Sequence, residues 1–152
     1  MDTHAPKHRG RLGLRVLRLL LGFCAVAWGA SWYGVFTSWS SAGEALQGMG
    51  AQSIPYDPMV DYWLRMASGA FGLVGCWYLI LAIWPSRFAP AIPWFGVLMV
   101  CEGLILLVHG MRLKLGPFPL YGDLSACFLG GIGIITLSRL THVRDLLRVS
   151  DQ

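Results

Sequence analysis

The hydrophobic positions of the chain gather into four long segments separated by shorter polar stretches. The segments run over about residues 14–36, 58–84, 93–111 and 120–137. Each is close to the roughly 20 residues that a helix needs to cross the hydrocarbon core of a bilayer. Backbone groups in lipid must be hydrogen-bonded within the protein, which leaves the helix as the structure of each segment. The pattern therefore predicts an all-α fold, an integral membrane four-helix bundle.

Helix-capping residues mark where two of these segments begin. Asp57 precedes Pro58, as expected of an N-cap followed by proline at the first helical position. Asp61 then places a negative charge in the first turn, where it interacts favourably with the helix dipole. Pro93 has the corresponding place in the third segment. These residues predict that the second and third helices begin at their prolines.

The stretch over residues 37–57 is the one sizeable connection between segments. Its Ser41-Ala42-Gly43-Glu44 run fits a capping box, which predicts a short helix ending near Gln47. Its few apolar residues and several glycines favour an ordinary connector over a lid resting on the bundle.

Composition excludes a soluble domain. Hydrophobic residues make up 55% of the 152 residues and charged residues 13%, about half of the roughly 25% typical of soluble chains. The net charge of +4 does not indicate a nucleic-acid partner, because the basic residues flank the apolar segments. The expected surroundings are a lipid bilayer, with no nucleic acid.

The placement of lysine and arginine predicts the orientation in the membrane. With the N-terminus inside, nine of the twelve basic residues fall on the inner side and three on the outer side. The excess predicts an inner-membrane protein with both termini in the cytoplasm. Residues 1–13 and 139–152 would be basic cytoplasmic tails, and residues 14–138 the transmembrane domain.

A cleaved signal peptide is the alternative for the first segment. Ala25-Val26-Ala27 resembles a cleavage site for a signal peptidase. The apolar run nevertheless continues from Trp28 to Phe36, with no polar region before the site, which favours an uncleaved span.

The sequence contains no recognisable metal, cofactor or catalytic motif. The four cysteines each lie in a different apolar segment, without a Cys-x-x-Cys pair. His109 is alone within the spans, so a metal or haem site is not expected and no cofactor is predicted. There is also no Gly-x-Ser-x-Gly or phosphate-binding glycine loop, which argues against an enzyme without excluding one.

Small residues recur at helical spacing in every segment. Because lipid removes the hydrophobic drive between helices, such residues allow close approach of their backbones. The faces predicted to pack are Gly96, Gly103 and Gly110; Gly122, Ala126 and Gly130; Ser68, Gly72 and Cys76; and Ala25 with Gly29. The same faces also suit a homo-oligomer.

Glu102 is the most unusual residue in the chain, because it lies near the middle of the third span. An ionised carboxylate there costs about 2.5–3.5 kcal/mol on insertion scales. His109 follows on the same helical face, while Arg65 and Asp123 lie in the outer halves of their helices. We predict one intramembrane polar cluster of Glu102, Arg65, His109 and Asp123, with Arg65 as the cation for Glu102. The second-tier members are Asp61 and Arg112.

Each member of this cluster also has a structural interpretation. Arg65 follows Asp61 by four residues, the spacing of an ordinary helical ion pair. Asp123 could favour a helix N-terminus, His109 could lie at headgroup level, and Glu102 could hold helices together. A structural network and a ligand or proton site therefore both remain open.

The second and third segments resemble those of the BphX-like family of small four-helix membrane proteins. The resemblance rests on Asp61-Tyr-Trp-Leu-Arg65 leading into Gly69 to Gly75, and on Glu102 at the centre of the third segment. It covers about residues 12–140. It implies an inner-membrane bundle and no particular reaction.

Three functions are compatible with these features. The first is a non-enzymatic accessory or partner subunit of another membrane protein. The second is a small-molecule or proton-coupled binding or transport protein that uses the intramembrane polar cluster. The third, weaker hypothesis is an oligomeric membrane enzyme acting on a lipophilic substrate.

Overall fold

The computed structural model describes residues 5–140, with side chains from residue 12 onward. The regular secondary structure of this part of the chain is entirely helical: α1 (Ala5–Gly29), α2 (Trp32–Phe36), α3 (Trp39–Gly48), α4 (Pro58–Ile83), α5 (Ile92–Arg112) and α6 (Pro117–Leu140). Four stretches are long and apolar enough to cross a membrane: Leu12–Phe36, Pro58–Ile83, Ile92–Arg112 and Pro117–Leu140. The predicted all-α fold with four membrane-length segments is confirmed.

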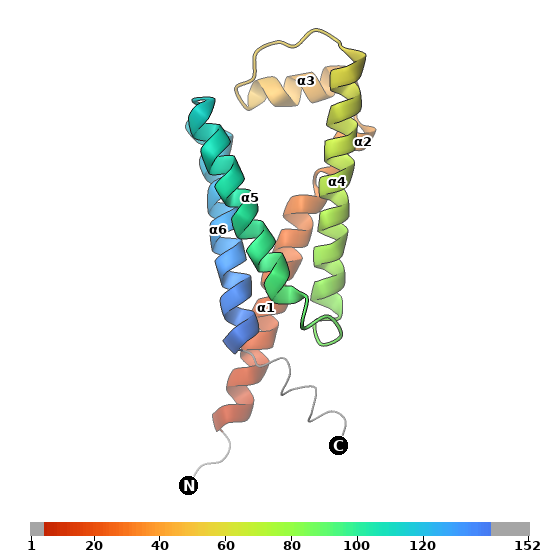
Figure 1. Cartoon of the computed structure of the whole chain (residues 1–152). Helices are drawn as coiled ribbons and strands as arrows, with labels where there is room; N and C mark the ends of the chain where they lie inside the picture. The colour runs from red at the N-terminus through yellow and green to blue at the C-terminus, as the bar shows by residue number, and fades with distance from the viewer. Residues whose placement is uncertain (1–4, 141–152) are drawn as a thin grey trace.

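The long helices form two pairs. α1 packs along α4, α5 packs along α6, and the two pairs meet chiefly where α1 contacts α6. In Figure 1, α4 and the α5–α6 pair diverge towards one end of the bundle, where α3 lies across the opening. We call this the α3 end. The opposite end, with the connection between α4 and α5, is called the closed end.

The hydrophobic core lies towards the closed end. Leu17 and Leu21 of α1, Leu81 of α4, Ile92 of α5 and Ile134 of α6 are almost completely buried. These residues come from all four long helices. Leu81, Ile92 and Ile134 lie in the halves of their helices nearest the closed end, and Leu17 and Leu21 lie near the middle of α1. The two helix pairs are therefore joined firmly at this end and diverge at the other.

Tyr78 ties α4 to α5 at the edge of this core. Its side chain is 2% exposed, and its hydroxyl donates to the carbonyl oxygen of Phe95 at 3.3 Å. The two rings are also in edge-on contact, with centroids 5.4 Å apart. Since the two helices otherwise touch little, this contact helps to fix the divergence of the pairs.

The first membrane segment is not one continuous helix. α1 ends at Gly29, and α2 begins at Trp32 after a tight turn in which Ser31 N–H donates to the carbonyl of Trp28 at 3.1 Å. α1 ends at a glycine, Gly29, and glycine both weakens a helix and readily adopts the conformations of a turn. The prediction of one continuous helix over residues 14–36 was therefore wrong.

Glycines bring the backbones of each helix pair together. An added Cβ at Gly75 of α4 would lie 2.7 Å from Gly29 Cα and 3.0 Å from Ala25 O of α1. One at Gly131 of α6 would lie 2.7 Å from Gly96 O of α5. No side chain fits at these points, so both pairs depend on glycine for their closest approach.

The predicted small-residue faces are partly confirmed. Gly96, Gly103 and Gly110 are all buried against α6, and Ala25 and Gly29 meet α4, as expected. In α6, however, Gly122 has nothing within 4 Å of its Cβ position. In α4 the closest contact is made by Gly75, whereas Cys76 is exposed. A repeat of four drifts around the helix, because a turn holds 3.6 residues.

The short helix of the connecting stretch is present, but its predicted cap was wrong. α3 begins after Ser38, whose hydroxyl oxygen accepts from Ser41 N–H at 3.3 Å. Ser41 therefore lies within the helix and supplies the donor. Ala42 of α3 is 6% exposed, so the helix is in contact with the rest of the molecule.

The two predicted tails lie partly outside the described residues. Residues 141–152 and 1–4 are outside them. Residues 5–13 continue α1 without a break, so the described part of the N-terminal tail is helical. α6 begins at Pro117, has a non-helical Phe118, and extends to Leu140, beyond the predicted residue 137.

Replacing Asp57 by alanine is expected to destabilise the start of α4. The Asp57 carboxylate accepts from the N–H groups of Met59 at 2.7 Å and Val60 at 3.2 Å, as its predicted capping role requires. Loss of such a cap costs about 1 kcal/mol. Thermal unfolding in detergent should show the decrease for Asp57→Ala and a smaller one for Asp57→Asn, which keeps an acceptor. Equal decreases would contradict the capping role.

Candidate functional site

A cavity of about 250 Å³ lies between the two helix pairs. All four long helices contribute to it, together with the turn after α1. Its lining residues are Phe23, Cys24, Ala27, Trp28, Ser31, Phe71, Met99, Glu102, Leu106, Asp123, Ala126 and Cys127. Leu17, Leu21, Leu81, Ile92 and Ile134 of the core are not among them, so the cavity begins where the tightly packed core ends.

Aromatic rings from α1 and α4 form one wall of the cavity. Trp28 and Phe71 meet edge to face, with ring centroids 5.3 Å apart. Phe23 precedes Trp28 on α1 by more than one turn and also lines the cavity. The contact between Trp28 and Phe71 holds α1 and α4 together next to the cavity and gives this wall an apolar, polarisable surface.

Sulfur atoms lie where the cavity meets the core. Cys24 and Cys127 are free and buried, and Met99 accepts a hydrogen bond from the Tyr78 hydroxyl at 3.5 Å. An added Cβ at Gly130 would lie 3.2 Å from Met99 Sδ and 3.8 Å from Cys24 Sγ. Gly130 of α6 therefore lies beside the sulfurs that α5 and α1 contribute.

Two carboxylates, Glu102 of α5 and Asp123 of α6, are the charged groups in the lining. Glu102 is half-buried and Asp123 is more exposed. Both line the same cavity as the free thiol of Cys127. Neither forms a hydrogen bond or ion pair with any residue in the described part of the chain, and the lining contains no basic residue.

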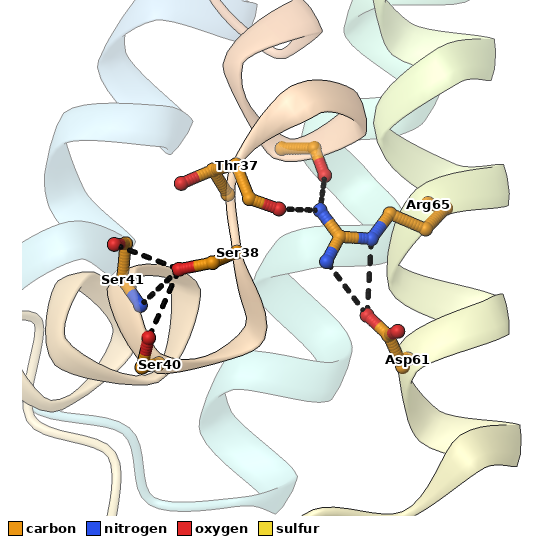
Figure 2. Close-up of polar contacts among 7 residues, drawn as sticks. Thr37, Ser38, Ser40, Ser41, Asp61 and Arg65 are labelled. Carbon is orange, nitrogen blue, oxygen red and sulfur yellow. Dashed lines mark hydrogen bonds and ion pairs between the residues drawn. The ribbon is translucent and has the colours of Figure 1, made fainter.

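Arg65 is engaged elsewhere. Its guanidinium forms an ion pair with Asp61 at 2.9 Å and donates to the carbonyl oxygens of Gly34, at 2.7 Å, and Thr37. Figure 2 shows these contacts around the turn between α2 and α3. The prediction that Arg65 is the cation for Glu102 was wrong, because the local carboxylate and the carbonyls at the end of α2 occupy its donors. The structural interpretation, a helical pair with Asp61, is confirmed.

The predicted polar cluster is therefore divided. Glu102 and Asp123 share the cavity, while Arg65 and Asp61 form a separate contact that fixes the turn between α2 and α3. His109 and Arg112 are exposed in the last turn of α5 and do not line the cavity.

Sequence reasoning missed the aromatic and sulfur residues of the lining. A signal was present in α1, where Phe23, Ala27 and Ser31 recur every four residues and Cys24 and Trp28 lie beside them. That spacing places them on one face of a helix. It does not reveal which neighbour the face meets, or that a cavity rather than a packed contact lies there.

The arrangement can hold a molecule that has both an apolar and a polar part. The wall is mainly aromatic and aliphatic, and two carboxylates line it without a hydrogen-bond donor among the described residues. A mainly apolar wall with a few polar groups is typical of small-molecule sites. Among the residues that the structure describes, no group of three or more His, Cys, Asp or Glu side chains is placed to hold a metal ion.

Fold and site together define a small helical protein with four membrane-length segments and a largely apolar cavity that two carboxylates line. Comparisons with protein-family models, with curated proteins and with solved structures give no match.

Proposed function

We propose that this chain is a multi-pass protein of the inner membrane that binds a small molecule in the cavity between its helix pairs. The main support is that Glu102 and Asp123 line a largely apolar cavity without a partner among the described residues. A carboxylate within a membrane span is costly unless a partner or water offsets the loss of hydration. A bound molecule with complementary groups would supply that partner.

The proposed orientation has both termini in the cytoplasm. It is supported by the nine of twelve lysine and arginine residues that would lie on the cytoplasmic side. The α3 end, towards which the helix pairs diverge (Figure 1), would then face away from the cytoplasm. The molecule would enter from that side or from the outer leaflet. The resemblance to the BphX-like family stays a prediction, and it is consistent with this placement.

An accessory or partner subunit is the second candidate function. The observation in its favour is the exposed position of His109 on α5. Lipid tails offer no hydrogen bonds to an imidazole, whereas a helix of a neighbouring membrane protein does. The two candidates predict different molecules bound to the purified protein.

Native mass spectrometry of the full chain, purified in mild detergent, tests these candidates. We expect a small molecule retained in a 1:1 complex, present in Glu44→Gln and lost in Glu102→Gln. Glu44 is the matched control because it is exposed in α3 and outside the cavity. A stoichiometric protein partner with no small molecule would contradict the proposal and support the accessory role.

Transport of the bound molecule is an extension of the same proposal. Flux into proteoliposomes that depends on pH and disappears in Glu102→Gln would support it. Retention of the ligand without flux would identify a binding protein instead.

A further inference from the structure

We propose that the molecule bound in the cavity is an organic cation with a compact apolar body. This inference rests on the proposed function, since it names the ligand class of the same site. It follows from three properties of the lining: its charge, its aromatic wall and its size.

The charge of the lining is one-sided. Glu102 and Asp123 are its ionisable oxygen acids, and none of the lining residues is basic. Arg65, which the sequence suggested as the cation for Glu102, is held by Asp61 and by two backbone carbonyls. A ligand that balances the charge of the lining must therefore be positive. An anionic ligand would add a third negative group to an environment with little water to separate the charges.

The aromatic wall suits the body of such a ligand. Trp28 and Phe71 lie in contact in the lining, and Phe23 extends the same surface. Aromatic rings attract cations through their quadrupole, and indole does so most strongly, particularly for alkylated ammonium groups that carry little hydration. The wall therefore favours an organic cation over a hydrated inorganic one.

The cavity volume limits the size of the ligand. A cavity of about 150 Å³ lined by apolar residues accommodates benzene, so the 250 Å³ observed suits a single ring with a small substituent. The described residues hold no set of three potential metal ligands, which argues against a bare metal ion as the occupant.

Glu102 and Asp123 would act in sequence along the cavity. Asp123 is exposed near the start of α6, whereas Glu102 is half-buried in the middle of α5. A cation would meet Asp123 first and Glu102 after it has lost more of its water. Glu102 is thus the residue whose charge should decide affinity.

Binding of the cation competes with a proton. A proton that binds to either carboxylate removes the negative charge with which the cation pairs. The other titratable groups facing the cavity are Cys24 from α1 and Asp123 and Cys127 from α6, while α4 contributes Phe71. Affinity should fall as the pH is lowered.

Three isosteric probes separate charge from shape. Benzyltrimethylammonium is the cation, neopentylbenzene its neutral carbon analogue, and phenylmethanesulfonate an anion of similar size. The full chain in phosphatidylcholine nanodiscs, with Cys76→Ala and Cys101→Ala, retains only the cavity thiols Cys24 and Cys127. Occupancy is measured as the slowing of N-ethylmaleimide alkylation, followed by mass spectrometry and normalised at each pH to the rate without probe.

We expect the cation alone to protect the thiols, with protection weakening as the pH falls. Glu102→Gln should weaken it by about thirtyfold or more, the usual effect of removing one partner of a buried charge pair, and Glu44→Gln should leave it unchanged. The pH series and Asp123→Asn provide the same test if Glu102→Gln does not fold.

Equal protection by neopentylbenzene or by phenylmethanesulfonate would overturn the inference of a cation and leave the proposed small-molecule site standing. Protection by none of the probes would also overturn it. The retained ligand in the native mass spectrum then decides the proposed function separately.

Discussion

Gly75→Ala is expected to destabilise the pair of α1 and α4 by about 3 kcal/mol, the upper end of the usual cost of overpacking. The added methyl group would lie 2.7 Å from Gly29 Cα and 3.0 Å from Ala25 O. Both are backbone atoms of α1, so no side-chain rotation can make room and the helices must separate. The loss should be visible as a lower midpoint in denaturant titrations of the protein in mixed micelles.

Gly22→Ala is the matched control for this substitution. Gly22 also lies in a helix of membrane length, but nothing is within 4 Å of its Cβ position. Alanine there should be neutral or stabilising by up to about 1 kcal/mol, because glycine is the weaker helix former. If both variants lose the same stability, the close approach at Gly75 is not what holds α1 against α4.

The glycines of α5 and α6 show how far helix packing can be predicted from the sequence. A glycine every seven residues keeps to one face of a helix, and Gly96, Gly103 and Gly110 all contact α6 as predicted. The repeat of four that begins at Gly122 moves off that face, so Gly122 is left without a neighbour. Spacing predicts which residues share a face, whereas the neighbour depends on how helices distant in sequence cross.

The same distinction applies to the candidate site. Glu102 is conspicuous in the sequence because a carboxylate is costly at membrane depth, and the structure places it in a cavity. The partner of Arg65 was mispredicted for a different reason. The carbonyls of Gly34 and Thr37 become acceptors because α2 ends there, and α2 exists only because the first span breaks after Gly29. The continuous apolar run from residue 14 to residue 36 gives no sign of that break.

The position of the core relates the fold to the proposed binding. Large side chains such as Leu21, Leu81 and Ile134 fill the closed end completely. Beyond Met99 and Cys127 the pairs diverge, and the space between them is lined by aromatic rings and two carboxylates rather than filled. A bundle held at one end can admit a ligand between its pairs without losing its core, which is where most of its packing stability lies.

Arg65→Ala is expected to release the turn between α2 and α3 from α4. The guanidinium reaches the carbonyls of Gly34 and Thr37 from one nitrogen and the Asp61 carboxylate from the others. Hydrogen bonds to charged groups contribute about 1.5–3 kcal/mol each. Because Arg65 and Asp61 are about a quarter exposed, we expect a total loss of about 2 kcal/mol after screening by solvent.

Limited proteolysis of the protein in nanodiscs measures this release directly. The stretch between α3 and α4 should be cut faster in Arg65→Ala, because α3 is no longer anchored through the turn that precedes it. The cleavage rate of Arg65→Lys should lie between those of the wild type and Arg65→Ala. Lysine keeps the positive charge, but its ammonium group cannot reproduce the planar guanidinium that bonds the carbonyls and the carboxylate at once. Arg112→Ala is the control, because Arg112 is exposed near the same end of the bundle and makes no ion pair with a described residue. Cleavage at the wild-type rate in Arg65→Ala would mean that α3 is held by its own contacts, such as that of Ala42, and not by the arginine.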